Sequence, residues 1–79
     1  MLSAVELQSV KIISLEQGKE RLFDIKMQSE RLLFQMQNEG NIADWQKLSN
    51  ERYELKKAKR NIQHQMGKIV AERHNGRND

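Results

Sequence analysis

The chain has 79 residues, with 14 Lys and Arg against 11 Asp and Glu, no Cys and no Pro. This length holds one domain at most, and so small a core rarely supplies more than about 3–5 kcal/mol of stability. Without cysteine the chain can form neither a disulfide nor a thiolate metal site. Its stability must therefore come from helix packing, from a partner, or from both. The net charge of +3 is mild and does not favour a nucleic-acid binder.

The N-terminal residues 1–10 contain Glu6 and lack a basic region, so no signal peptide is expected. No apolar stretch approaches the roughly 20 residues that a membrane-spanning helix needs. The lack of cysteine fits a reducing compartment. We therefore expect a cytoplasmic protein that does not enter a membrane.

Helix-tolerant residues dominate, and no stretch alternates apolar and polar residues as a strand does, so an all-α fold is expected. Two sequences match a capping box, one from Ser3 to Glu6 and one from Ser14 to Gln17. Either one helix runs through both, or residues 3–13 form a separate short segment. Gly18, just inside the second start, favours the break.

A first long helix is expected over residues 14–37, a turn over residues 38–41 and a second long helix over residues 42–73. Gly40 can take the left-handed conformation that closes a helix, and Asn41 suits the N-cap of the next. A short turn between two long helices predicts an antiparallel, coiled-coil-like hairpin.

The second helix contains Gly67, which costs about 1 kcal/mol relative to Ala. We expect this helix to end before Gly76, and residues 77–79 to fray.

Apolar residues at helical spacing predict the contact between the two helices. Those expected to pack the hairpin are Leu22, Ile25, Leu32 and Met36 on the first helix, and Trp45, Leu48, Leu55, Ala58, Ile62 and Ile69 on the second. Trp45, beside the turn, is expected to pack against Leu33 or Phe34.

Three large apolar residues of the first helix lie outside that contact. At about 100° per residue, Phe23, Met27 and Phe34 are displaced from the packing residues by roughly 150°. A hairpin needs only one apolar stripe on each helix, and Phe and Met are common at contact surfaces. These three residues are therefore predicted to bind another polypeptide.

No catalytic, cofactor or metal site is expected. His64 and His74 are ten residues apart, which is not the spacing of metal ligands on one helix face. No strand precedes any glycine, so no phosphate-binding loop is expected.

A basic run could form a phosphate-binding face; it comprises Arg52, Lys56, Lys57, Lys59 and Arg60. Glu51 and Glu54 lie within it, and Glu54 can pair with Lys57 at helical spacing. An ion-paired, solvated face is the favoured interpretation, and nucleic-acid contact stays an alternative.

One segment resembles a known family. The order Trp45-Gln46, Glu51, Leu55, Ala58, Ile62, Gly67 and Ile69, after the turn at residues 40–44, resembles the second helix of the needle-protein co-chaperones of bacterial type III secretion systems, the YscE-like proteins. The resemblance covers residues 32–70. Trp45 replaces a more usual Tyr, and the N-terminal segment and the basic residues 56–60 also depart from the family.

The resemblance implies an α-helical hairpin that binds a larger, tetratricopeptide-like chaperone in the cytoplasm. Through that chaperone it would help to keep the needle subunit monomeric before export. Two alternatives stay open: a homodimeric four-helix bundle that serves as an adaptor or assembly protein, and a small nucleic-acid-binding regulator.

Overall fold

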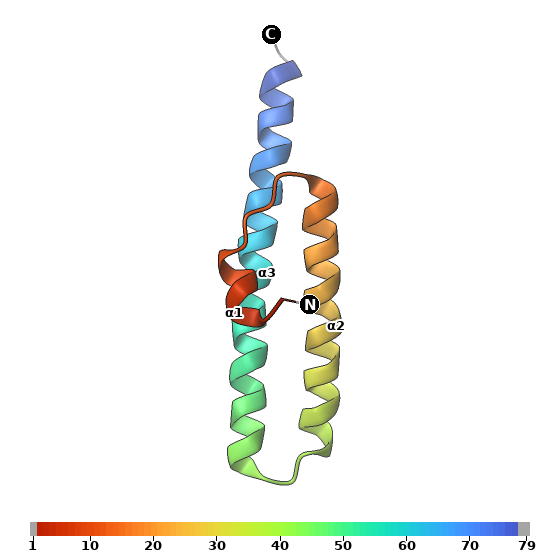
Figure 1. Cartoon of the computed structure of the whole chain (residues 1–79), viewed down its shortest axis with the longest axis vertical. Helices are drawn as coiled ribbons and strands as arrows, with labels where there is room; N and C mark the ends of the chain where they lie inside the picture. The colour runs from red at the N-terminus through yellow and green to blue at the C-terminus, as the bar shows by residue number, and fades with distance from the viewer. Residues whose placement is uncertain (1, 78–79) are drawn as a thin grey trace.

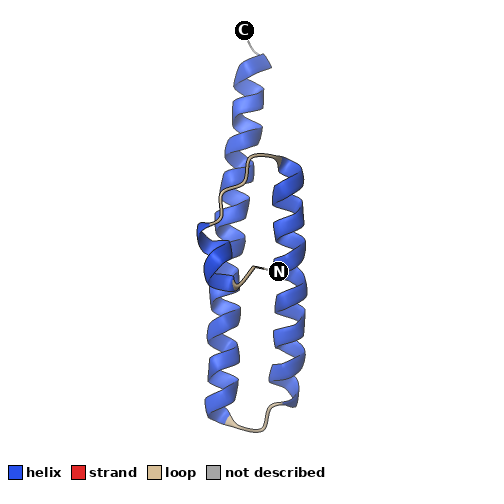
Figure 2. Ribbon diagram, viewed as in Figure 1, coloured by secondary structure: helices blue, strands red, loops and turns tan. Residues whose placement is uncertain are grey.

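The computed structural model describes the backbone of residues 2–77 and the side chains of residues 2–73. Its elements are a short helix, α1 (Ala4–Ser9), and two long helices, α2 (Leu15–Asn38) and α3 (Ile42–Arg77). Helices α2 and α3 pack antiparallel, α1 lies against α3, and α3 projects past the start of α2 (Figure 1). Within residues 2–77 the only regular elements are helices, as Figure 2 shows. The expected all-α hairpin with an extra N-terminal helix is confirmed.

The chain is not helical between α1 and α2, because each of the two helices begins at its own N-terminal cap. At α1 the capping box is complete: Ser3 Oγ accepts from the Glu6 N–H at 3.2 Å, and Glu6 Oε1 accepts from the Ser3 N–H at 3.3 Å. At α2, Ser14 Oγ accepts from the Gln17 N–H at 3.2 Å, whereas Gln17 Oε1 accepts from the Ile13 N–H at 2.9 Å. The segment 3–13 is thus helical only over Ala4–Ser9, and a non-helical connection that begins at an extended Val10 leads to α2.

The turn between α2 and α3 is closed by side chains. Asn41 caps α3 as expected, because its Oδ1 accepts from the Ala43 N–H at 2.9 Å. The left-handed closure expected at Gly40 is wrong, since no described residue has a positive φ. Helix α2 ends instead with an extended Glu39, and Asn38 Nδ2 donates to the Phe34 carbonyl at 2.8 Å. At the helix end itself, the Glu39 N–H donates to the Met36 carbonyl at 3.4 Å, which satisfies one of the last four carbonyls of α2.

Helix α3 continues through Gly67 and Gly76 to Arg77, beyond the end expected near Arg73. Without proline, a long helix tolerates the cost of about 1 kcal/mol that one exposed glycine imposes. Of the residues expected to fray, Arg77 is helical, and Asn78 and Asp79 lie outside the described residues.

The core involves all three helices. The buried hydrophobic residues are Leu7, Ile12, Ile25, Leu32, Leu55, Ala58 and Ile62, and Leu22, Leu48, Met66 and Ile69 are among those packed against them. Leu7 is 0% exposed, and it was not expected in the core. Helix α1 therefore covers part of α3 that a two-helix hairpin would leave open to water.

Two amide side chains of α3 hold the end of α1. Asn61 Nδ2 donates to the Leu7 carbonyl at 3.1 Å and to the Val10 carbonyl at 3.2 Å. Gln65 Nε2 donates to the same Val10 carbonyl at 2.8 Å, and Gln65 Oε1 accepts from the Ile12 N–H at 2.9 Å. Because a helix end leaves carbonyls without intrahelical donors, these bonds make docking of so short a helix possible.

Gly18 brings the start of α2 close to α3. A Cβ at this position would lie 2.6 Å from both Cγ and Sδ of Met66 and 3.1 Å from Cδ1 of Ile12. At Gly67, on α3, a Cβ would meet nothing within 4 Å. Gly18 is thus required by packing, whereas Gly67 has free space around it.

We predict that Leu7→Ala lowers the free energy of unfolding by about 2–4 kcal/mol, because it leaves a cavity under α1. Val5→Ala, in the same helix at a side chain that is 70% exposed, is the matched control and should change it by less than about 0.5 kcal/mol. Urea unfolding followed by circular dichroism measures both. Equal effects of the two substitutions would show that α1 is not docked on α3.

We predict that Gly18→Val lowers the free energy of unfolding by about 1–3 kcal/mol, because the added methyl groups overpack the contact with Met66. The same substitution at Gly67 should stay within about 0.5 kcal/mol of the original chain. Thermal and urea unfolding of the pair give the comparison. An equal loss at both positions would contradict the close approach at Gly18.

Candidate partner-binding surface

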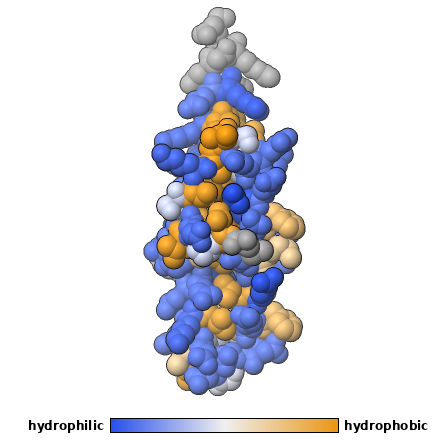
Figure 3. Space-filling model, viewed as in Figure 1, coloured by the Kyte–Doolittle hydropathy of each residue, from blue (hydrophilic) through white to orange (hydrophobic). Residues whose placement is uncertain are grey.

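The three residues predicted to bind a partner lie on the solvent side of α2. Phe23 is 61% exposed, Met27 40% and Phe34 68%, and we call these three residues the outer stripe. At about 100° per residue, all three point about 160–180° away from Ile25, which is buried against α3. Figure 3 shows hydrophobic groups at the edge of the molecule along α2, apart from the orange band in the middle. The outer stripe is therefore on the opposite side of α2 from the core.

The additional helix does not cover this stripe. Helix α1 packs on α3, and its buried residue, Leu7, joins the core there. Three helices therefore leave one face of α2 unburied, as a two-helix hairpin would. The exposed aromatic area on α2 remains available to another molecule.

Acidic residues continue the outer stripe along α2. Glu16, Glu20 and Glu30 are exposed and fall on the same line, because positions 16, 20, 23, 27, 30 and 34 are separated by alternating steps of four and three residues. The ion pairs among the described side chains are Arg21–Asp24 and Lys57–Glu54, and neither includes these three carboxylates. This spacing is visible in the sequence alone, although the three acidic residues were not predicted to belong to the partner-binding surface.

The residues expected to pack the hairpin lie mostly in or beside the core. Ile25, Leu32, Leu55, Ala58 and Ile62 are buried, Leu22, Leu48 and Ile69 pack against them, and Met36 is half-buried. Trp45 differs from the expectation, because it is 44% exposed and does not belong to the core cluster. It points about 80° away from the direction of Leu55 on α3, which turns its ring away from the middle of the contact.

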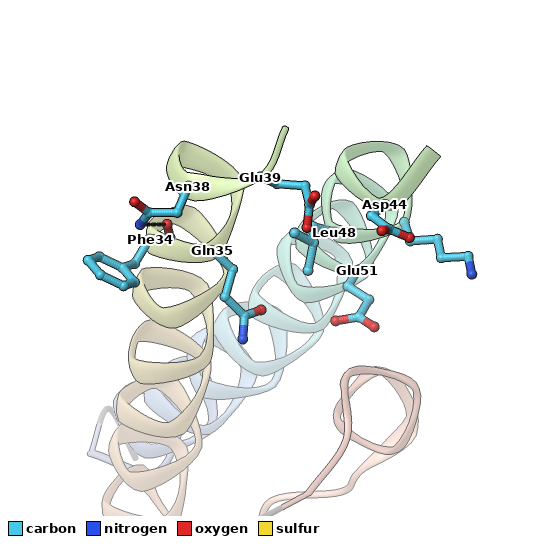
Figure 4. Close-up of a pocket in the computed structure, with 8 residues that line it drawn as sticks. Phe34, Gln35, Asn38, Glu39, Asp44, Leu48 and Glu51 are labelled. Carbon is cyan, nitrogen blue, oxygen red and sulfur yellow. Dashed lines mark hydrogen bonds between the residues drawn. The ribbon is translucent and has the colours of Figure 1, made fainter. Parts of the chain in front are cut away.

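A cleft opens between α2 and α3 at the turn end of the hairpin. It has a volume of about 540 Å³ and is lined by Phe34, Gln35, Asn38, Glu39, Asp44, Lys47, Leu48 and Glu51. In Figure 4 the Phe34 ring points away from α3, while Gln35 and Leu48 point into the gap between the helices. Phe34 thus joins the cleft to the outer stripe, and the cleft carries three carboxylates and one ammonium group.

The basic run lies on α3. Lys57 Nζ is 3.7 Å from Glu54 Oε1, which confirms the expected pair, and it also lies 4.8 Å from the centre of the Tyr53 ring. This lysine is therefore engaged within the helix through an ion pair and a cation–π contact. The arrangement is that of a partly self-paired helix surface.

In the part of the chain with described side chains, His, Asp and Glu nowhere form a group of three that could hold a metal ion. His64 is exposed, and the His74 side chain lies outside that part. None of the helices over residues 2–77 is long and apolar enough to cross a bilayer.

Sequence reasoning missed the residues that dock α1: Leu7 and Ile12 in the core, and Asn61 and Gln65 on α3. The available signal was the pair of amides four residues apart on one side of Ile62, because amide side chains can both donate to and accept from the backbone of another segment.

Comparison of the chain with family models, with curated proteins and with solved structures finds no match. The outer stripe and the resemblance over residues 32–70 are therefore the features that bear on function.

Proposed function

We propose that this chain is a cytoplasmic co-chaperone of a type III secretion system. It binds and stabilises a tetratricopeptide-like chaperone and, through it, helps to keep the needle subunit monomeric before export. The observation that carries the binding role is the outer stripe, which remains exposed on the side of α2 opposite the core. The identity of the partner comes from the resemblance of residues 32–70 to the YscE-like proteins.

The magnitudes support a role in binding. Burying a large apolar side chain contributes about 1.5–3 kcal/mol, and roughly half of each outer-stripe residue is still exposed. Covering all three would contribute roughly 3–5 kcal/mol, which is as much as a core of this size supplies. Part of that gain is offset by the cost of association, so further contacts must accompany the stripe. The cleft at the turn end, adjacent to Phe34, can supply them.

The geometry of α2 suits a helical-repeat partner. Tetratricopeptide repeats stack helix pairs into a superhelix with an extended concave surface. An amphipathic helix can lay its apolar face into such a groove through residues at spacings of three, four and seven. Phe23, Met27 and Phe34 have this spacing, with steps of four and seven residues. On this account α2 enters the groove of the chaperone, while α3 supports α2 from the opposite side.

We predict that Phe23→Asp combined with Phe34→Asp abolishes capture of the chaperone. Replacing two aromatic side chains that the partner would bury should weaken binding at least about hundredfold. The control, Tyr53→Asp with Val70→Asp, changes two exposed apolar residues of α3 and should bind normally. Tagged chains are used for pull-down from the host cytosol, and the bound proteins are identified. Light scattering then measures the molar mass of a purified pair, which should correspond to a 1:1 complex.

Circular dichroism should show that the double variant remains helical. If it still captures the same protein, the outer stripe is not the binding surface. If the protein captured by the original chain contains no helical repeats, the proposed co-chaperone function is wrong. A tight homodimer with no other partner would favour the adaptor alternative instead.

A further inference from the structure

We infer that the occupant of the outer stripe is an amphipathic helix that carries Lys and Arg beside its apolar face, and that it belongs to a different protein rather than to a second copy of this chain. This inference rests on the proposed function, in which the stripe binds a partner, and it names the chemistry of the partner's contact surface.

Two carboxylates of α2 lie within the line of the outer stripe. Glu20 precedes Phe23 by three residues, and Glu30 lies between Met27 and Phe34, so both fall in line with the apolar contacts. Neither belongs to an ion pair among the described side chains. A partner that covers Phe23 and Phe34 must also displace water from these carboxylates, which is unfavourable unless it brings opposite charge.

The acidic character extends beyond α2. The cleft next to Phe34 is lined by Glu39, Asp44 and Glu51, with Lys47 as its basic residue. The chain as a whole has a net charge of +3, so these carboxylates form a local negative patch on a protein whose net charge is positive. The nearest basic residues of α2, Lys19 and Arg31, point about 60° to either side of the stripe. A helix seated on the stripe would therefore meet carboxylates along its path.

A second copy of this chain would bring like charges together on the stripe, so it is not the best occupant. In a parallel pairing along the stripe, each Glu would oppose the same Glu of the other copy. In the antiparallel pairing that sets Phe23 against Phe34, each Glu30 would oppose Met27. The two Glu30 residues would then lie about 4.5 Å apart along the helix axis, at the centre of the contact. Like charges brought together in this way destabilise an interface, whereas Lys or Arg at those positions would form pairs.

The test uses two synthetic helical peptides as probes, one of Leu and Lys in heptad order and one with Glu in place of every Lys. The original chain should bind the Leu–Lys peptide at least about tenfold more tightly than the Leu–Glu peptide in about 0.05 M salt. This preference should decrease severalfold in about 0.5 M salt. Fluorescence anisotropy of labelled peptides measures the affinities.

The Glu20→Lys, Glu30→Lys double variant should lose or reverse the preference. The control places the same added charge at exposed positions of α3 that lie off the stripe, through Gln46→Lys, Gln63→Lys and Glu72→Lys. This control should keep the preference for the Leu–Lys peptide. Circular dichroism of both variants verifies that they fold.

Three outcomes would overturn the inference. They are equal binding of the two peptides, no binding of either, or a preference for the Leu–Lys peptide that the Glu20→Lys, Glu30→Lys variant retains. A dimer in sedimentation that Phe23→Asp with Phe34→Asp dissociates would also overturn it and make a second copy the occupant. The proposed function would survive any of the three peptide outcomes if the phenylalanine variant still lost the chaperone. It would fail, whatever the peptides do, if that variant kept the chaperone.

Discussion

The antiparallel contact between α2 and α3 determines what the rest of this molecule can do. Ile25 and Leu32 of α2 are buried with Leu55 and Ile62 of α3, and this contact fixes the rotation of α2 about its own axis. Since side chains follow one another at about 100° along a helix, Phe23 and Phe34 must then point to solvent. The exposed aromatic surface is thus a geometric consequence of the core.

Helix α1 strengthens that constraint without altering it. Leu7 completes the core on the side of α3, and the amides of Asn61 and Gln65 satisfy the carbonyls at the end of a helix too short to be stable alone. Most of what α1 could bury is therefore used on α3. Helix α1 thus adds a third helix to the core and still leaves the outer stripe uncovered.

The hairpin was predictable because its signals are local and repeated. Ser3, Ser14 and Asn41 mark helix starts, and the apolar spacing of Leu48, Leu55 and Ile62 marks the packed face of α3. Such signals depend on neighbours within one helical turn, so one sequence suffices to read them.

What the sequence did not predict depends on contacts between distant segments. The docking of α1 requires Asn61, more than fifty residues from Leu7, and the role of Gly18 depends on Met66. Gly40 would permit a left-handed turn, but the chain does not use one, because an extended Glu39 ends α2 and its N–H donates to the Met36 carbonyl. The position of the outer stripe followed from helix periodicity alone, but that it stays uncovered depends on where α1 docks.

The central claim is that the outer stripe is open in the isolated chain and closed by a partner. Because the chain has no cysteine, single substitutions Phe23→Cys, Phe34→Cys and Tyr53→Cys report separately on the stripe and on an exposed position of α3. The decisive measurement is the rate at which each thiol reacts with a maleimide, alone and after the partner has bound. The account predicts equally fast reaction of all three alone, and selective protection of the two stripe positions in the complex. Slow reaction at either stripe position in the isolated monomer, or equal protection of Tyr53→Cys in the complex, would contradict it.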